Sequence, residues 1–336
     1  LIDGVHLFPR LSTPPAGNPH SMKHTTSFLL SLCLWAMTAI SVSAAERTVS
    51  ITLDDLPYVS AQDASLAAAS RANEALRQAL RDYHAPADLF LVGEQVERDG
   101  ETAERQALMR QWEKDGHHLH NHSYSHPAFS QTDLAAYLAN VSRGEAVVEG
   151  LRGSDRTSPA YPHFYRAPYN DLGGSAEKYQ ALNAALSKAK VLPAPFTLHN
   201  HDWRFEEAYS KALADGDQAL AQRISEAYLQ QLQLEFDFAE QLSRDTFDRE
   251  VPQVLLLHAN RLNADHLGAV LKKLQERGYR FVSLQQATAD PAYAIADGSQ
   301  GTSGISWLHR WRKTLGQPDR LGEEPPFPAW LEKPAQ

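Results

Sequence analysis

The sequence predicts an α/β fold in which parallel strands alternate with helices. Runs of strand length recur between longer stretches whose apolar residues are spaced three or four apart, as on one face of a helix. Polar residues suited to chemistry follow directly after several of these runs. Because parallel β/α folds place their sites at the carboxyl ends of strands, both observations indicate one sheet wrapped by helices.

The elements of the first half begin with a short apolar strand that ends in two aspartates. In order, we expect a strand within residues 50–58, a helix over 66–83, a buried strand over 87–92, a helix over 102–115 that stops at Gly116, a histidine-rich strand, and a helix with Leu134, Tyr137, Leu138 and Val141 on one face. A strand that ends at residues 165–168 and a helix over 176–188 follow.

The second half continues the alternation and ends in a tail of different composition. We expect residues 191–198 to lead into a His-Asn-His-Asp-Trp segment, followed by a long amphipathic stretch over 218–244, an apolar strand over 254–257, a helix with Leu267, Val270, Leu271 and Leu274 on one face, and a last strand over 279–284. Residues 291–336 contain Trp307, Trp311 and Trp330, which could stack on sugar rings. Large aromatic side chains usually serve burial, so we expect a tail packed on the barrel.

The amino-terminal 44 residues are expected to lie outside this fold. Residues 1–21 are rich in proline and show no periodicity, so we interpret them as a non-native or mis-annotated leader and Met22 as the start of translation. Residues 22–44 have the pattern of a secretory signal peptide, with a mature protein that begins near Ala45. The alternative, an uncleaved anchor, would need about 20 apolar residues, and this run is shorter. We therefore expect an exported protein, periplasmic or secreted, with no stable membrane insertion after cleavage.

Composition narrows the chemistry and the partners. Cys33 is the only cysteine and lies in the expected signal, so the exported protein would have neither a disulfide nor a thiol nucleophile. The formal net charge is −9, and no basic run interleaved with aromatic residues appears, which argues against nucleic acid as a partner.

A metal site is indicated by residues 116–127, which contain five histidines. His122 and His126 are four residues apart, so one helical turn after the strand would place both imidazoles on one face. Imidazole nitrogen suits zinc, but two ligands do not close a site. Such a pair taken alone is more often a surface accident than a metal site.

The third ligand is expected from the pair Asp54 and Asp55. Strand side chains alternate, so the two carboxylates would point apart if the strand continued. At a strand end, where Pro57 imposes a turn, both can reach one cavity. One carboxylate could then bind a metal while the other remains free as a base.

Three further segments, residues 164–170, 197–204 and 254–260, complete a pattern. In order, Thr-Leu-Asp-Asp, His-Ser-x-x-His, Arg-x-Pro-Tyr, Asp-Trp and Leu-x-His resemble the five motifs of the polysaccharide deacetylases, the carbohydrate esterase family four enzymes with a NodB homology domain. The resemblance spans about residues 48 to 290, so it implies a deacetylase domain over residues 45–290. It also implies a distorted (β/α)7 barrel.

The resemblance implies a metal-dependent hydrolase. Asp55, His122 and His126 would be the metal ligands, with one divalent ion, most commonly zinc, and cobalt, nickel or manganese as alternatives. Such an ion would polarise the acetamide carbonyl and lower the pKa of its bound water, the nucleophile, toward ~7.

The remaining motif residues would carry proton transfer and substrate contacts. The resemblance implies Asp54 as the general base oriented by Arg166, and His258 as the general acid held protonated by Asp202. The residues implied to contact the substrate are Tyr169, whose backbone N–H would stabilise the oxyanion, and Leu256 and Trp203, which would form an apolar wall for the acetyl methyl group.

The expected substrate is an N-acetylated glycan such as peptidoglycan, a chitin-like polymer or an exopolysaccharide. O-acetyl ester hydrolysis, a small-molecule amidase activity and a catalytically silent glycan-binding protein are the alternatives. The chain departs from the family pattern at His199, where the family often has aspartate, and at Leu53. His199 and the nearby His201 could reshape the pocket or add a second metal contact, and His120 could line the barrel interior.

Overall fold

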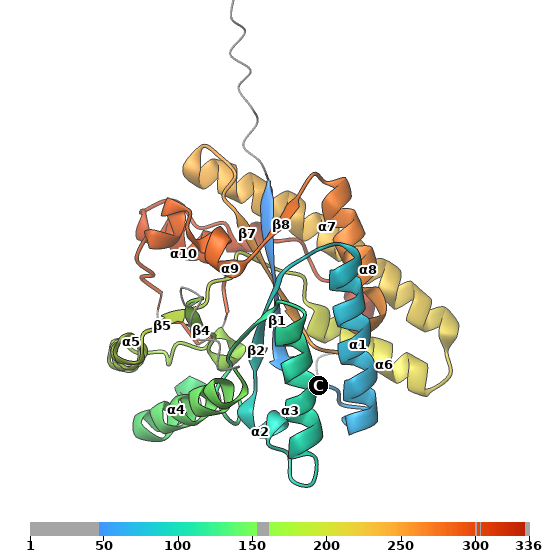
Figure 1. Cartoon of the computed structure of the whole chain (residues 1–336). Coiled ribbons are helices and arrows are strands. Elements are labelled where there is room, and N and C mark those ends of the chain that lie inside the picture. The colour runs from blue at the N-terminus through green and yellow to red at the C-terminus, as the bar shows by residue number, and fades with distance from the viewer. Residues whose placement is uncertain (1–46, 153–160, 300, 303, 333–336) are drawn as a thin grey trace, which may run out of the picture. The chain divides into compact units, whose positions relative to one another are not determined.

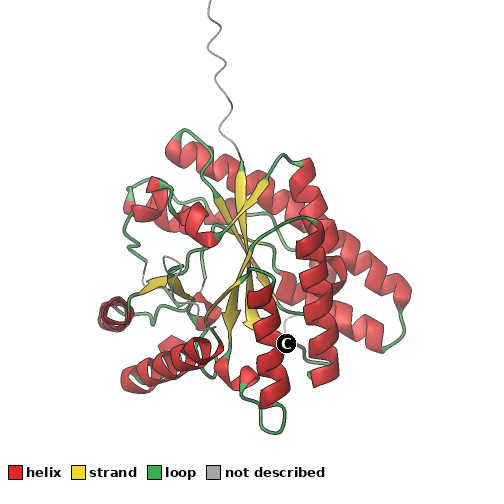
Figure 2. Cartoon of the chain, viewed as in Figure 1, coloured by secondary structure: helices red, strands yellow, loops and turns green. Residues whose placement is uncertain are grey.

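The computed structural model describes residues 47–152, 161–299, 301–302 and 304–332. The leader and signal segments predicted above lie outside these residues. Eight strands lie at the centre of the described part, and helices surround them (Figures 1 and 2). The strands are β1 (Thr48–Leu56), β2 (Ala87–Leu91), β3 (His118–Asn121), β4 (His163–Tyr165), β5 (Val191–Pro193), β6 (Leu198–His199), β7 (Gln253–His258) and β8 (Arg280–Val282). The α/β prediction is confirmed.

The helices between the strands follow the predicted periodicity closely. They are α1 (Leu66–Asp82), α2 (Gly93–Val96), α3 (Thr102–Lys114), α4 (Leu134–Leu151), α5 (Ala176–Ala189), α6 (Asp202–Ala214), α7 (Gln218–Phe247), α8 (Arg261–Glu276), α9 (Leu284–Thr288) and α10 (Trp307–Thr314), with 3-10 turns η1 (Phe129–Gln131), η2 (Pro168–Asn170), η3 (Pro291–Ala294), η4 (Leu321–Glu323) and η5 (Ala329–Leu331). None of the helices in the described ranges is long and apolar enough to cross a membrane.

The strands form a curled parallel sheet in the order β5-β4-β3-β2-β1-β7-β6, and β8 pairs with the first residues of β1. β5 and β6 follow each other along the chain yet lie at opposite edges of this order. Only residues 194–197 join them, and a chain of that length spans at most about 18 Å. The two edges must therefore approach each other, as the predicted distorted (β/α)7 barrel requires.

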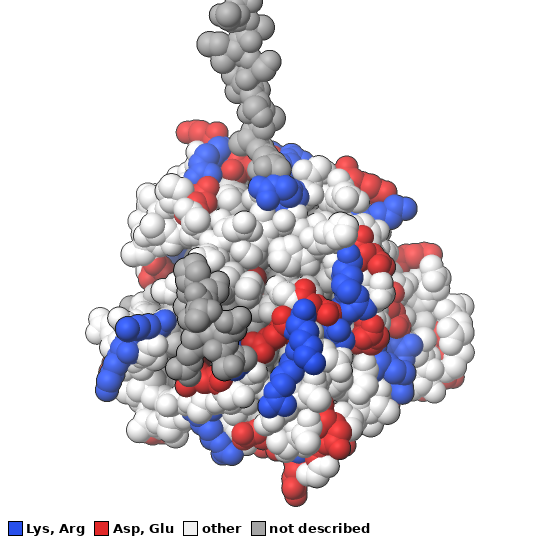
Figure 3. Space-filling model, viewed as in Figure 1, with Lys and Arg blue, Asp and Glu red and all other residues white. Residues whose placement is uncertain are grey.

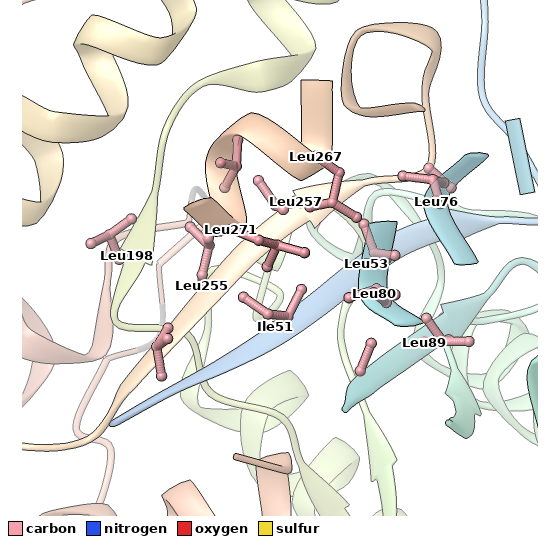
Figure 4. Packing of buried hydrophobic residues seen from close by; sticks show 14 of the residues in the cluster. Ile51, Leu53, Leu76, Leu80, Leu89, Leu198, Leu255, Leu257, Leu267 and Leu271 are labelled. Atoms are coloured by element: carbon pink, nitrogen blue, oxygen red, sulfur yellow. The ribbon is translucent and has the colours of Figure 1, made fainter. Parts of the chain in front are cut away.

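The two faces of the sheet bury two different apolar clusters. On β7, Leu255 and Leu257 pack outward with residues of the covering helices, and Figure 4 shows them beside Leu267 and Leu271 of α8. The alternating residues Val254 and Leu256 face the interior cluster, which also contains three phenylalanines, Phe90, Phe164 and Phe196. Because side chains alternate along a strand, the residues that continue the interior row point toward the barrel mouth.

Two features of this region were not predicted. Residues 191–198 contain two short strands, β5 and β6, because Pro193 and Pro195 interrupt the segment and the chain changes from one sheet edge to the other. After His201, Asp202 begins α6, a helix that the sequence analysis did not place.

The carboxyl-terminal segment lies against the barrel. The indole of Trp311 is fully buried and its ring centroid lies 4.9 Å from that of Tyr293. The backbone N–H of Trp307 donates to the carbonyl of Phe196, next to the crossing between β5 and β6. Trp330 is 41% exposed. On the face shown in Figure 3, basic and acidic side chains are interspersed, as on an ordinary solvated surface.

Candidate active site

The candidate site lies where several strands end. β1, β3, β4, β6 and β7 are all parallel, so their carboxyl ends lie at the same edge of the sheet. The five motifs identified in the sequence follow or overlap these five strand ends. Segments more than 200 residues apart in the chain, such as those that carry Asp54 and His258, therefore meet at one mouth of the barrel.

The two aspartates share this mouth because of the backbone at Asp55. The predicted strand end lies at the two aspartates, and β1 in fact continues one residue further, to Leu56, with a register shift against β2 between Leu53 and Leu56. Asp55 has a φ of 63°, a left-handed conformation that aspartate tolerates better than most residues. This bulge breaks the alternation of side chains, so both carboxylates reach the same site.

The two histidines are presented by a loop and not by the predicted helical turn. After β3, Ser123 and His126 both have positive φ values, 69° and 56°. The side chain of Asn121 accepts the N–H of Ser123, and the hydroxyl of Ser123 accepts the N–H of His126. These side-chain oxygens accept backbone N–H groups that would donate to backbone carbonyls in a helix. The four-residue spacing therefore does not form a helical turn.

Helix α4 supports this loop from behind. Asn140 accepts the N–H groups of Tyr124 and Ser125, at 2.8 and 3.1 Å. Asn121 donates to the carbonyl of Val141, at 2.9 Å. The close approach depends on Gly144, because a Cβ there would lie 2.4 Å from the Asn121 amide oxygen.

Asp55, His122 and His126 form a group whose ligand-type atoms all lie within 4.8 Å of one another. Asp55 Oδ1 lies 3.2 Å from His126 Nε2 and 3.5 Å from His122 Nε2. Neither contact is aligned as a hydrogen bond, and this buried oxygen has no other partner among the described residues. A tetrahedral ion with bonds of about 2.1 Å separates its ligands by about 3.4 Å, so the spacing fits a shared cation.

The protonation states also suit a cation. His122 Nδ1 lies 2.7 Å from the carbonyl of Arg166, so Nδ1–H donates to it and Nε2 carries the free lone pair. Burial lowers the pKa of His122, as does the neighbouring His126, which favours the neutral ring. Burial raises the pKa of Asp55, but His126, His258 and His122 outweigh it and leave that pKa well below its ordinary value.

Asp54 is held by a buried arginine. Arg166 Nη1 donates to Asp54 Oδ1 at 2.6 Å and also to the hydroxyl of Thr52, and its Nη2 donates to the carbonyl of Pro195. The guanidinium lies over the ring of Phe90, 4.2 Å from its centroid. The other carboxylate oxygen, Oδ2, faces His122 Nε2 at 3.8 Å. One oxygen of Asp54 is therefore fixed, and the other is directed at the candidate metal-binding group of Asp55, His122 and His126.

His258 is held from the opposite side. Its Nδ1 lies 2.8 Å from Asp202 Oδ1, and its backbone N–H donates to Asp202 Oδ2 at 2.8 Å. Burial lowers the pKa of His258, but the charge and hydrogen bond of Asp202, assisted by Asp55 and Asp54, raise it to about 10. His258 is therefore a protonated imidazolium whose Nε2–H is not used by Asp202.

Sequence reasoning missed the residues that hold Asp202. Asn263 Nδ2 donates to Asp202 Oδ2 at 2.5 Å and to the carbonyl of His258 at 2.8 Å. Tyr228 fixes the orientation of this amide, because its hydroxyl donates to Asn263 Oδ1 at 2.6 Å. Asn260, the N-cap of α8, also approaches Asp202 Oδ2, at 3.4 Å. The only sequence signal was two asparagines shortly after Leu-x-His, at the start of a helix.

The three predicted substrate-contact residues occupy different positions. Tyr169 has a φ of 57°, and its exposed ring stands edge-on to His126, 4.7 Å between centroids. Leu256 is buried in the interior row of β7, two residues before His258. Trp203 lies in the first turn of α6 and is 59% exposed, so its ring is not part of the buried core. The ring of Tyr169 thus contacts a residue of the site, whereas Leu256 and Trp203 are near His258 and Asp202 along the chain.

His120 lies inside the barrel. It is buried, and its Nε2 lies 2.8 Å from Asp88 Oδ1. Asp88 also accepts the hydroxyl of Tyr161 and the backbone N–H of Leu284. Burial lowers the pKa of His120 to about 4, because its effect exceeds that of Asp88, whose hydrogen bond and charge raise the pKa. This interior pair is fully partnered and does not reach the metal-ligating group.

Comparisons with known proteins agree on one family. Residues 41–187 match the family model described as polysaccharide deacetylase. The peptidoglycan-N-acetylmuramic acid deacetylase PdaC of Bacillus subtilis (strain 168) is 20% identical over 246 residues, 73% of this chain and 40% of that protein. A peptidoglycan-N-acetylglucosamine deacetylase of Bacillus cereus is 28% identical over 93 residues, 28% of this chain and 30% of that protein. The chain thus spans less than half the length of these curated relatives.

Solved structures from the same family are also similar to this chain. The structure of PdaC from Bacillus subtilis is 19% identical, with a TM-score of 0.46, and covers 73% of this chain and 91% of that one. A Bacillus anthracis protein described as a CE4 family pseudoenzyme is 14% identical, with a TM-score of 0.49, and covers 72% of this chain and 66% of that one.

Proposed function

The chain belongs to the polysaccharide deacetylase family, and on that premise we propose that it is a metal-dependent hydrolase that removes N-acetyl groups from a glycan. The substrate class is an N-acetylated polysaccharide or oligosaccharide: peptidoglycan, which the names of the two curated relatives specify for those proteins, a chitin-like polymer or an exopolysaccharide.

One observation carries the proposal. A carboxylate fixed by Arg166 faces the group formed by Asp55, His122 and His126. An imidazolium fixed by Asp202 lies close enough for the charges of Asp55 and Asp54 to raise its pKa. Glycan binding alone requires neither a base nor an acid. Hydrolysis of an amide requires both, because the attacking water must lose a proton and the departing amine must gain one.

The metal is proposed from the donor set. Two imidazole nitrogens and one carboxylate oxygen suit zinc and leave an open position, with cobalt, nickel or manganese as alternatives. When bound, such an ion would polarise the substrate carbonyl and acidify water. Asp55, His122 and His126 would hold it, and the buried, unpartnered Oδ1 of Asp55 is the observation that supports this fit.

The chain's own residues would divide the remaining work. Asp54 Oδ2 accepts a proton from the attacking water while Arg166 keeps the carboxylate in place. His258 donates its Nε2 proton to the leaving nitrogen, and Asp202 stabilises the imidazolium until then. The backbone N–H of Tyr169 would stabilise the oxyanion, and Leu256 and Trp203 would contact the acetyl group.

We further propose that the enzyme acts outside the cytoplasm, where a peptidoglycan or exopolysaccharide substrate would be found. The signal-peptide pattern in residues 22–44 supports this. Mature protein isolated from cells should begin near Ala45. An intact Met22 on the mature protein would instead support a retained membrane anchor.

Acetate release tests the proposed activity. Protein purified from cells that express the full chain would be incubated separately with N-acetylated peptidoglycan, chitin oligosaccharides and an N-acetylated exopolysaccharide. O-acetylated xylan would be tested in parallel. We expect acetate from at least one N-acetylated glycan. Release from the O-acetylated polymer alone would assign an esterase, and release from none of them would refute a glycan deacetylase.

A further inference from the structure

A groove between α1, α6 and α8 lies outside the candidate active site and shares no residue with it. Its volume is about 430 Å³, and four segments line it: the three helices and the loop that follows β1. Helix α8 contacts both α1 and α6 (Figure 1). Small-molecule sites commonly have volumes of about 300–1,000 Å³, so the groove is large enough to hold a ligand.

The groove continues from the two strands that carry the proposed base and acid. Tyr58, four residues after Asp54, lines it, and so does Arg261, three residues after His258. The backbone N–H of Ala259 donates to the carbonyl of Asp54 at 2.9 Å, which pairs the two segments as they leave the sheet. Four residues span at most about 14 Å, so both segments reach the groove within that distance of the site.

The polar part of the lining is suited to a ligand without net charge. Two arginines and two aspartates belong to it, so their charges balance. Arg261 Nε donates to Asp265 Oδ2 at 2.6 Å, and Arg71 Nη2 lies 3.8 Å from Asp63 Oδ2. Each contact uses one of the five N–H groups of a guanidinium, so further N–H groups can donate to a ligand. The amide of Gln62 adds a donor and an acceptor.

The apolar part of the lining forms the floor. Tyr58, Ala68 and Ala72 are buried in one cluster, and Ala264 of α8 packs against it. The charged lining residues are exposed and therefore form the rims. A sugar ring has apolar C–H faces and a perimeter of hydroxyl groups. It can pack on such a floor while its hydroxyl groups form hydrogen bonds with the rims.

We propose that this groove binds sugar residues of the same glycan chain from which the N-acetyl group is removed. The inference rests on the proposed deacetylase activity. A chain bound at the barrel mouth would pass over the paired segments after β1 and β7 and continue between α1 and α6. The enzyme would then bind long chains more tightly than short ones, so its substrate would be a polymer or a longer oligosaccharide.

Affinity for chains of two lengths tests the proposal without reference to turnover. Full-chain protein with Asp54→Asn would be purified from cells, loaded with zinc and titrated in a calorimeter with the dimer and the hexamer of β-1,4-linked N-acetylglucosamine. We expect the hexamer to bind about tenfold more tightly than the dimer. Adding Ala75→Trp, which fills the groove, or Arg261→Ala, which removes donors from its rim, should lower this ratio by about threefold or more.

Lys272→Ala is the matched control. Lys272 pairs with Glu276 four residues along α8, as Arg261 pairs with Asp265, but it lies outside the groove. The control should keep the ratio of the parent protein. Circular dichroism would show which variants fold, and Arg261→Ala, at an exposed position, remains the test if Ala75→Trp does not.

Three outcomes would overturn the groove as a glycan site. They are a hexamer that does not bind, a hexamer that binds no more tightly than the dimer, and a ratio that Arg261→Ala leaves equal to that of the Lys272→Ala control. Failure of the proposed activity would be recognised separately, as the absence of acetate release from the hexamer by protein that retains Asp54.

Discussion

Asp202 contacts His258 through both of its carboxylate oxygens: Oδ1 faces the ring Nδ1 at 2.8 Å, and Oδ2 accepts the backbone N–H at 2.8 Å. One residue thus sets the position of the imidazole and its proton affinity. The raised pKa of His258, about 10, means that the proposed acid is protonated at neutral pH and loses its proton only on the alkaline side.

Asp202→Asn should shift the alkaline limb of the pH profile. Removing the negative charge lowers the pKa of His258 toward its ordinary value near ~6.5, so the protonated fraction at pH 8 falls. We expect kcat at pH 8 to drop by about 10²-fold, with the alkaline limb at least ~1 pH unit lower than in wild type. The measurement is kcat against pH from 5 to 10. An unchanged alkaline limb would exclude His258 as the group that titrates there.

Asn263→Ala should weaken the same unit indirectly. The substitution removes one hydrogen bond from each of three groups: Oδ2 of Asp202, the carbonyl of His258 and the hydroxyl of Tyr228. We expect a loss of about 1–3 kcal/mol in the free energy of unfolding and a smaller fall in kcat than in Asp202→Asn. Tyr228→Phe, which removes only one of these hydrogen bonds, should fall between wild type and Asn263→Ala in urea denaturation. Equal stability of all three proteins would refute the network.

Asp54→Asn should separate base catalysis from metal binding. The amide keeps the shape of the side chain but accepts a proton poorly, and Asp54 is not one of the three ligands. Acetate release should fall by about 10²–10⁴-fold while zinc content stays equal to that of wild type. His126→Ala is the matched comparison and should lose one ion together with activity. If Asp54→Asn also lost an ion, Asp54 would be a ligand and not the base.

Gly144→Ala should disturb the histidine loop from a distance. The new Cβ would lie 2.4 Å from Asn121 Oδ1 and 2.7 Å from the carbonyl carbon of Ser123, so helix and loop must separate. We expect destabilisation of about 1–3 kcal/mol and weaker zinc binding by the Asp55, His122 and His126 group. Gly150→Ala on the same helix meets nothing within 4 Å and should be neutral or stabilising by about 1 kcal/mol. Similar behaviour of the two variants in thermal melts and zinc titration would contradict the packing argument.

The sequence carried enough information to predict the alternation of strands and helices, because the apolar periodicities of elements such as α8 and β7 are distinct. The five motifs led to residues that the structure brings to one edge of the sheet. The local geometry was not predictable in the same way. No local sequence pattern records the left-handed conformation of Asp55. The loop that carries His126 depends on side chains such as Asn140, which accepts two backbone N–H groups of the loop from helix α4.

Partners distant in sequence were the hardest to predict. Asn263 was not distinguishable from an ordinary helix residue until Asp202 and Tyr228 were seen beside it. This network depends on how α7 and α8 pack on the barrel, and no local spacing records that packing.

The central claim, a metal-dependent hydrolase, is tested most directly by chelation and reconstitution on a responding glycan. Acetate release by wild-type protein would be measured before chelation, after chelation, and after addition of zinc chloride, with Asp54→Asn treated in parallel. We predict that chelation abolishes release, that zinc restores it in wild type, and that Asp54→Asn stays inactive throughout. Acetate release that persists at full rate in metal-free wild-type protein would contradict the account.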